Sequence, residues 1–147
     1  MSEKKDQWNI KVGITFGAFD LLHACHVLML EEAKDVCDHL IVAVQSDPSI
    51  DRPSKNKPIQ SYEERLIQVR ALRCVDEVVL YDTEDDLIQV LLKLKPDVRI
   101  IGADHKGKKF TGWELPIEIY FNSRSHSYSS SELRQRIYQA EKSKQLL

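Results

Sequence analysis

The sequence has little of several features, and each shortage excludes a class of protein. Its 147 residues contain only five glycines and five prolines, too few for a collagen-like or low-complexity chain. No stretch approaches the roughly 20 consecutive apolar residues that a membrane-spanning helix requires. The first ten residues lack the apolar segment of a secretory signal. We therefore expect a cytoplasmic protein that has no membrane partner.

Cysteine and net charge are also low. The three cysteines include no CxxC pair, which favours reduced thiols over a disulfide framework or a cysteine-bound zinc site. The formal net charge of −2 argues against a nucleic-acid partner, because duplex binding depends on clustered positive charge. The dinucleotide motif GxGxxG and the Walker phosphate loop are both absent. A phosphate group would therefore have to be held by another part of the chain.

Short β-rich segments alternate with segments of helical periodicity. We expect strands at residues 11–16, 39–45, 77–80, 98–101 and 116–121, and helices at residues 23–36, 61–72, 85–93 and 132–142. This alternation predicts the α/β class, with a Rossmann-like, doubly wound parallel sheet of about five strands. The length suits a single domain over residues 1–147, with residues 1–10 as an N-terminal extension and residues 143–147 as a tail. Functional residues are expected in the turns beyond the carboxyl ends of the strands, where such sheets bind ligands.

The polar segment of residues 46–60 is long for a connection inside one domain. It contains three prolines and the cations Arg52, Lys55 and Lys57. Loops of this length are usually functional or disordered, so a mobile basic flap is one interpretation. The other is a loop whose charges are simply solvated.

The turn after the first expected strand, GAFDLLHACH, carries two histidines at the start of a helix. His23 and His26 are three residues apart and therefore share one helix face. A helix amino end presents free N–H groups and partial positive charge, so two imidazoles beside it would form an anion site. The alternative is structural: one histidine caps the helix and the other packs, which is the commoner outcome for an isolated HxxH pair. Metal binding fits less well, because i, i+4 spacing suits two helical ligands better.

The segment GAFDLLHACH resembles the GxFDxxHxGH signature of the cytidylyltransferase-like nucleotidyltransferases. Four later segments, SYEER, RCVDEVV, GADHKGK and RSHSYSSSELRQRI, are similar in the same order to landmarks of the glycerol-3-phosphate cytidylyltransferase branch. The resemblance covers about residues 11–137. It implies an enzyme that moves CMP from CTP to a phosphorylated small alcohol, glycerol 3-phosphate first, and releases pyrophosphate. It also implies a homodimer.

The resemblance assigns roles residue by residue. His23, His26 and Arg124 would be catalytic, in contact with the phosphates of the triphosphate, and Lys55 and Arg73 would bind the acceptor. The residues that would bind the nucleotide are Phe16, Gly17, Ala18, Phe19, Asp20, Cys25, Lys57, Asp104, Ser129, Ser130 and Ser131. Mg²⁺ would arrive with the triphosphate, held largely by phosphates and water. Without the resemblance, the three serines would be an ordinary helix cap.

The chain departs from the family pattern at a few positions. Cys25 and Ser127 stand where the family has glycine, and Leu87 lies near the place of an acceptor-binding lysine. The segment DTEDDLIQVLLKLKPDV followed by GADH also resembles the sugar-phosphate (heptose phosphate) adenylyltransferases. A sugar phosphate with CTP or ATP is therefore the second candidate substrate pair. A weakly active, nucleotide-binding regulatory protein is the third hypothesis.

Overall fold

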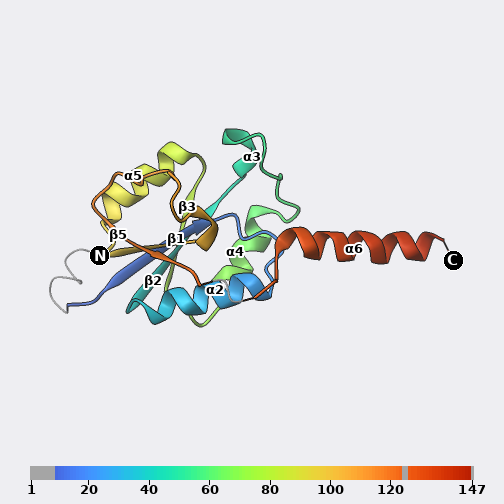
Figure 1. Ribbon diagram of the computed structural model, residues 1–147, viewed down its shortest axis with the longest axis horizontal. Helices are drawn as coiled ribbons and strands as arrows, with labels where there is room; N and C mark the ends of the chain where they lie inside the picture. Colours follow the sequence, from blue (N-terminus) through green and yellow to red (C-terminus); the bar gives the residue numbers. More distant parts are fainter. Residues whose placement is uncertain (1–8, 124–125, 147) are drawn as a thin grey trace.

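Five parallel strands form one sheet at the centre of the computed structural model, which describes residues 9–123 and 126–146. In chain order the strands are β1 (Val12–Gly17), β2 (His39–Gln45), β3 (Glu77–Tyr81), β4 (Val98–Ile101) and β5 (Glu118–Phe121). The helices are α2 (Ala24–Asp35), α3 (Pro48–Asp51), α4 (Tyr62–Arg70), α5 (Glu84–Leu94) and α6 (Ser130–Gln145), with a short 3-10 helix, η1 (Ala103–His105). The predicted α/β class and parallel sheet are confirmed (Figure 1).

β1 lies in the middle of the sheet, whose strand order is β3-β2-β1-β4-β5. The chain adds β2 and β3 on one side of β1 and then crosses back through α5 to add β4 and β5 on the other side. The direction of winding therefore reverses between β1 and β4. In a doubly wound sheet this reversal opens a crevice at the carboxyl ends of the strands, which is the usual place for a ligand.

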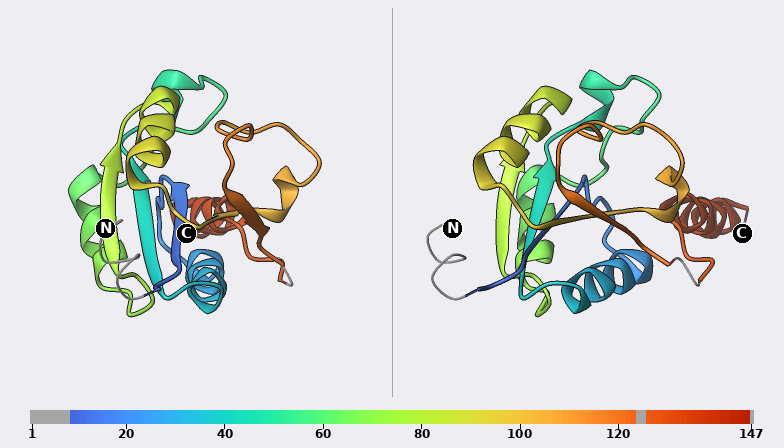
Figure 2. Two further views of the ribbon diagram at one scale, coloured as in Figure 1. Left: turned by 90° about the vertical axis from the view of Figure 1, so that its left-hand side faces the viewer. Right: turned by 60° about the vertical axis from the view of Figure 1, so that its left-hand side comes forward.

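Helices cover the sheet on both faces, which explains why β2 is an almost continuous buried apolar run. On one face, α2 and α4 pack against the strands through Leu30, Ala33 and Val69. On the other face, α5 packs through Leu87 and Leu91. Figure 2 shows the strands between α2 and α5. The core is thus two apolar layers that meet at the sheet.

The long polar loop after β2, expected to be irregular, begins with the short helix α3. Asp47 caps this helix by accepting from the backbone N–H of Ser49 at 2.9 Å, and Pro48 occupies its first turn. Asp51 at its end accepts from the backbone N–H of Glu84 at 2.6 Å, which ties α3 to the start of α5. One turn of helix is too short to produce a periodic apolar pattern, so the sequence contained only its capping signal.

α6 projects away from the body of the molecule, and none of its residues is buried (Figure 1). Its cap is Ser129, whose Oγ accepts from the backbone N–H of Glu132 at 3.1 Å. The helix begins two residues earlier and ends three residues later than the pattern predicted. Within the described part of the chain, no helix has the length and apolar character needed to cross a membrane.

One buried guanidinium ties the carboxyl edge of the sheet together. Arg65, on α4, is only 2% exposed. Its Nη1 donates to the carbonyl oxygens of Ala18 at 2.9 Å and of Gln45 at 2.6 Å. Its Nη2 donates to Ser46 O at 2.6 Å and its Nε to Ser61 O at 3.3 Å. The chain segments that follow β1 and β2 are therefore fixed to the start of α4.

Arg65→Met removes these four hydrogen bonds and takes this donor from the carbonyl groups of Ala18, Gln45 and Ser46. We expect the free energy of unfolding to fall by about 3 kcal/mol or more, because each unsatisfied buried group costs about 1–3 kcal/mol. Urea denaturation measures the change. Arg70→Met, at the exposed end of the same helix, is the matched control and should shift the free energy by less than about 0.5 kcal/mol. Equal shifts in the two variants would contradict this role of Arg65.

Candidate functional site

His23 and His26 cap the amino end of α2 with their own side chains. The Nδ1 of His23 accepts from the backbone N–H of Cys25, and the Nδ1 of His26 accepts from the backbone N–H of His23, both at 3.2 Å. The structural alternative for this motif, a histidine cap, is therefore present. The cap engages only one nitrogen of each ring, because a neutral imidazole whose Nδ1 accepts a hydrogen bond carries its proton on Nε2. Each ring keeps an Nε2–H donor.

Both imidazoles are neutral at physiological pH. Burial, and next the neighbouring His23, lowers the pKa of His26 to about 4. Burial is also the main cause that lowers the pKa of His23, with smaller contributions from Arg136 and His126. The two rings therefore act toward an anion as neutral hydrogen-bond donors.

The amino end of α6 meets the first of these histidines. His23 Nε2 lies 2.9 Å from Ser130 Oγ, although the two residues are 107 positions apart in the chain. Ser129 is engaged as the α6 cap, and Ser131 is exposed. Two helix amino ends, each with partial positive charge, thus come together at one place. Arg124, predicted to be catalytic, lies outside the residues that the structure describes.

Asp20 joins three segments around this turn. Its carboxylate accepts from the backbone N–H groups of Ile59 and Gln60, both at 2.9 Å. The same carboxylate lies 3.1 Å from the guanidinium of Arg134 on α6. These three contacts tie the turn to the loop before α4 and to α6, which is the arrangement expected of a residue that braces the turn.

The backbone of the turn is held in an unfavourable conformation. Phe19 (φ 53°) and Leu21 (φ 51°) are both left-handed, which residues with a side chain rarely adopt. Phe19 is buried in the core and lies against His26, with ring centroids 5.6 Å apart. The backbone N–H of Leu21 donates to Gln60 Oε1 at 2.7 Å. Strain that the surroundings hold in this way clusters at functional sites.

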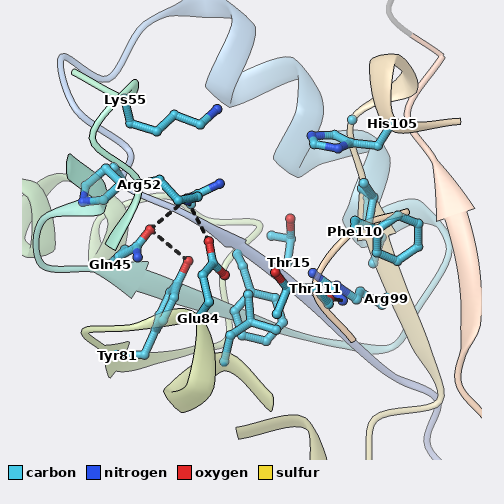
Figure 3. Close-up of a pocket in the computed structure, with 18 of the residues that line it drawn as sticks. Thr15, Gln45, Arg52, Lys55, Tyr81, Glu84, Arg99, His105, Phe110 and Thr111 are labelled. Atoms are coloured by element: carbon cyan, nitrogen blue, oxygen red, sulfur yellow. Dashed lines mark hydrogen bonds and ion pairs between the residues drawn. The ribbon is translucent and has the colours of Figure 1, made fainter. Parts of the chain in front are cut away.

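A cavity of about 320 Å³ lies at the carboxyl ends of β1, β2 and β4 (Figure 3). The predicted site residues that line it are Phe16, Gly17, Ala18 and Lys55. Met29 of α2 lines it too, and its sulfur lies 3.7 Å from the sulfur of Cys25. The cavity therefore adjoins the histidine turn through β1 on one side and α2 on the other.

Outside the histidine turn and the serines that face it, three more predicted site residues do not line the cavity. Lys57 is exposed in the loop before α4, and Asp104 is exposed on η1. Arg73 is exposed in the connection from α4 to β3, close to where β3 begins. Because the strands are parallel, that point is at the amino edge of the sheet, opposite to the cavity. The structure does not bring Arg73 to the other predicted acceptor residue, Lys55.

A comparison with known protein families matches residues 14–136 to the family described as cytidylyltransferase-like. The chain belongs to this family. The match begins within β1 and ends within α6, so it includes the histidine turn and the serines that face it. By family the chain is a nucleotidyltransferase, which confirms what the resemblance of its motifs implied.

The chain is also similar to named relatives and to a solved structure. The bifunctional protein HldE of Helicobacter pylori (strain HPAG1) is 39% identical over 128 residues, which are 86% of this chain and 27% of that protein. HldE of Campylobacter concisus (strain 13826) is 41% identical over 110 residues, which are 74% of this chain and 23% of that protein. The chain thus spans about a quarter of the length of these relatives. The lipopolysaccharide core biosynthesis protein of Thermoplasma volcanium GSS1 is similar in structure, with a TM-score of 0.65 and 28% identity over 82% of this chain and 99% of that one.

The cavity of this nucleotidyltransferase is also lined by polar side chains that the sequence did not mark as site residues. They are Thr15, Gln45, Arg52, Tyr81, Glu84, Arg99, His105 and Thr111 (Figure 3). Arg52 Nε lies 2.7 Å from Glu84 Oε1, and Arg52 donates to Gln45 Oε1 at 3.2 Å. The hydroxyl of Tyr81 donates to the same Gln45 oxygen at 3.4 Å. Burial raises the pKa of Tyr81, so this phenol stays neutral.

Arg99 is the clearest example of a cavity residue that was not predicted from the sequence. It is the second residue of β4 (VRII) and is 6% exposed. The segment predicted a buried strand, and a charged side chain inside such a strand was the available signal. Buried charges are rare unless they are paired or bind a ligand.

His26→Asn separates the capping role of the ring from its donor. The asparagine Oδ1 takes the place of Nδ1 and keeps the cap, whereas the Nε2–H is lost. We expect turnover to fall at least about 100-fold, as for other donors to developing charge, and the free energy of unfolding to change by less than about 1 kcal/mol. Pyrophosphate release and urea denaturation measure the two effects. His39→Asn, at the start of β2, is the control; activity of His26→Asn within a few fold of the parent would remove His26 from the mechanism.

The low pKa of His26 makes stability depend on pH. An unfolded histidine titrates near pH 6.5, whereas His26 in the folded chain stays neutral down to about pH 4. Between these values the unfolded state binds a proton that the folded state does not, so the free energy of unfolding falls as the pH decreases through this window. His26→Asn should show a shallower fall in urea denaturation. An NMR titration of the parent imidazole with a midpoint near pH 6.5 would contradict the prediction.

Proposed function

We propose that this chain transfers a nucleotidyl group from a nucleoside triphosphate, ATP first, to the phosphate of a sugar phosphate and releases pyrophosphate. The observation that carries the proposal is a polar cavity whose lining leads into the turn that carries the two histidine donors. The end of β1 lines that cavity and then leads into the turn that carries His23. A donor and an acceptor bound on either side of this turn would meet at it.

The cavity supports an acceptor with many hydroxyl groups. Its lining offers hydroxyls, an amide and a carboxylate, which together can donate to and accept from several sugar hydroxyls. A second hollow of about 470 Å³ shares lining residues with it and extends to Trp113. The residues common to both are Arg52, His105, Phe110 and Thr111. A three-carbon alcohol would leave most of these groups unused.

The relatives also favour a sugar phosphate over glycerol 3-phosphate as the acceptor. One of them is named for lipopolysaccharide core biosynthesis, and the segment from residue 82 to residue 105 resembles the heptose phosphate adenylyltransferases. CTP with glycerol 3-phosphate, the first expectation from the sequence, becomes the second candidate, because the ordered motifs of that branch are present as well.

The reaction requires two anions to be held in line. An oxygen of the acceptor phosphate attacks the α-phosphorus, the bond from that phosphorus to the bridging oxygen of the β-phosphate breaks, and pyrophosphate leaves with that oxygen. No protein nucleophile takes part, so the side chains act by positioning and by electrostatic stabilisation. The Nε2–H groups of His23 and His26 donate to phosphate oxygens, and the amino ends of α2 and α6 add partial positive charge.

Mg²⁺ fits this proposal as an ion carried by the triphosphate. Among the residues that the structure describes, no group of three or more His, Cys, Asp or Glu side chains is placed to hold a metal ion. Phosphate oxygens and water satisfy most of the coordination of Mg²⁺ in such complexes, so it needs no cage of protein ligands. When bound, it neutralises phosphate charge.

Pyrophosphate release tests the proposed function. The chain is incubated with Mg²⁺, with ATP or CTP, and with one acceptor from a panel of heptose phosphates, hexose phosphates and glycerol 3-phosphate. We expect release with ATP and a sugar phosphate, and a signal near background with His26→Asn. Release from CTP and glycerol 3-phosphate alone would replace the acceptor proposed here. Nucleotide binding without release from any pair would support the regulatory hypothesis instead.

The homodimer implied by the motifs is retained as part of the proposal. Sedimentation velocity should then give twice the 17.0 kDa mass of the chain. A monomer at the concentrations used for the pyrophosphate assay would contradict it.

A further inference from the structure

We infer that Arg99 binds the phosphate of the acceptor and is the guanidinium by which this chain recognises that substrate. The identity of the anion as an acceptor phosphate rests on the proposed function. The anion site itself rests on the surroundings of Arg99.

Arg99 is a buried cation whose hydrogen bonds are incomplete. Its Nη1 donates to the carbonyl oxygen of Thr111 at 2.5 Å. Its buried Nε has no hydrogen-bond partner among the described residues. Burial lowers the pKa of Arg99 to about 10, so the side chain is still charged at neutral pH. A buried charge in this state is costly unless a ligand completes its interactions.

The carboxylate that interacts electrostatically with Arg99, that of Glu84, already forms an ion pair with Arg52. Glu84 interacts with Arg99 electrostatically, but its Oε1 lies 2.7 Å from Arg52 Nε. The described lysine, arginine and acidic side chains that line the cavity are three cations, Arg52, Lys55 and Arg99, and one anion, Glu84. Figure 3 shows Lys55 and Arg52 on one side of the cavity and Arg99 on the other. The excess of positive charge favours an anionic occupant.

The guanidinium is held in a fixed orientation. Its Cζ lies 5.1 Å from the ring centroid of Phe16 and 5.2 Å from that of Phe110. Gly112, with φ of 83°, lets the loop approach closely, because a Cβ there would lie 3.1 Å from Arg99 Nη1. A planar fork that is oriented before binding loses little entropy when it binds a phosphate through two hydrogen bonds. Packing against these two rings therefore orients the guanidinium for recognition.

Inorganic phosphate is the probe for the site itself, because it requires no turnover. The Nε–H resonance of Arg99 is assigned by its loss in Arg99→Met and followed by NMR as phosphate is added. We expect this resonance to shift in a saturable way at millimolar phosphate, because an anion bound to the guanidinium changes the electronic environment of Nε. A resonance that does not move up to tens of millimolar overturns the anion site.

The stability of Arg99→Met without ligand separates recognition from simple packing. Methionine is apolar and fills similar space, and it removes an incompletely paired buried charge, so we expect a Tm equal to or above that of the parent. A clear loss of Tm, together with an unmoved Nε–H resonance in the parent, would show that Arg99 has only a structural role.

Kinetics tests the role in recognition with the assay described above. Arg99→Met should raise the KM for the sugar phosphate about 10- to 100-fold, the range expected for charge-assisted hydrogen bonds, and leave the KM for the nucleotide within about twofold. Arg99→Lys keeps the charge without the fork and should lie between parent and methionine variant. Arg70→Met, exposed on α4, is the charge-matched control and should change neither constant.

Failure of the inference and failure of the proposed function give different results. If no substrate pair releases pyrophosphate but the Nε–H resonance shifts with phosphate, the proposed function fails and the anion site stands. If the parent turns over and Arg99→Met leaves the KM for the acceptor unchanged, the role of Arg99 in recognition is overturned.

Discussion

The carboxyl edge of the sheet depends on hydrogen bonds from the Arg65 guanidinium to main-chain carbonyl groups. Buried carbonyl groups must find donors, and where parallel strands end the sheet no longer supplies them. Arg65 reaches the carbonyls of Ala18, after β1, and of Gln45, at the end of β2. Both of those residues line the cavity, whereas Arg65 does not. The histidine turn and the cavity are thus held in a fixed relative position by a residue that is not part of the cavity lining.

In the turn after β1, the same two imidazole rings cap a helix through Nδ1 and keep an N–H donor on Nε2. The Nδ1 atoms of His23 and His26 complete the α2 cap, and this fixes the proton of each neutral ring on Nε2. Capping therefore sets the orientation of the Nε2–H donors. The two interpretations of the HxxH pair, a helix cap and an anion site, are compatible. Burial then keeps the rings uncharged, so that the positive potential of the site comes from helix ends and from cations on the cavity side.

The sequence allowed most of the fold to be predicted, because alternation of buried strands and amphipathic helices leaves a periodic trace in residue type. It could not place α3, which is too short to show a periodic pattern. Nor could it identify Arg99 as a cavity residue, because its packing against the ring of Phe16, which is distant in the chain, appears only in the fold. The histidine turn and Ser130 were predicted as site residues from motifs that occur in the family's order. The topology of the sheet explains why these two segments lie next to each other. Arg73 was assigned through a motif as well, but a motif does not say at which edge of the sheet its residues lie.

The projecting helix α6 has a mechanical consequence. It touches the site through Ser130 in its first turn and Arg134 in its second, and none of its residues is buried in the core. Sixteen helical residues extend about 24 Å, so a small tilt at the first turn becomes a large displacement at the far end.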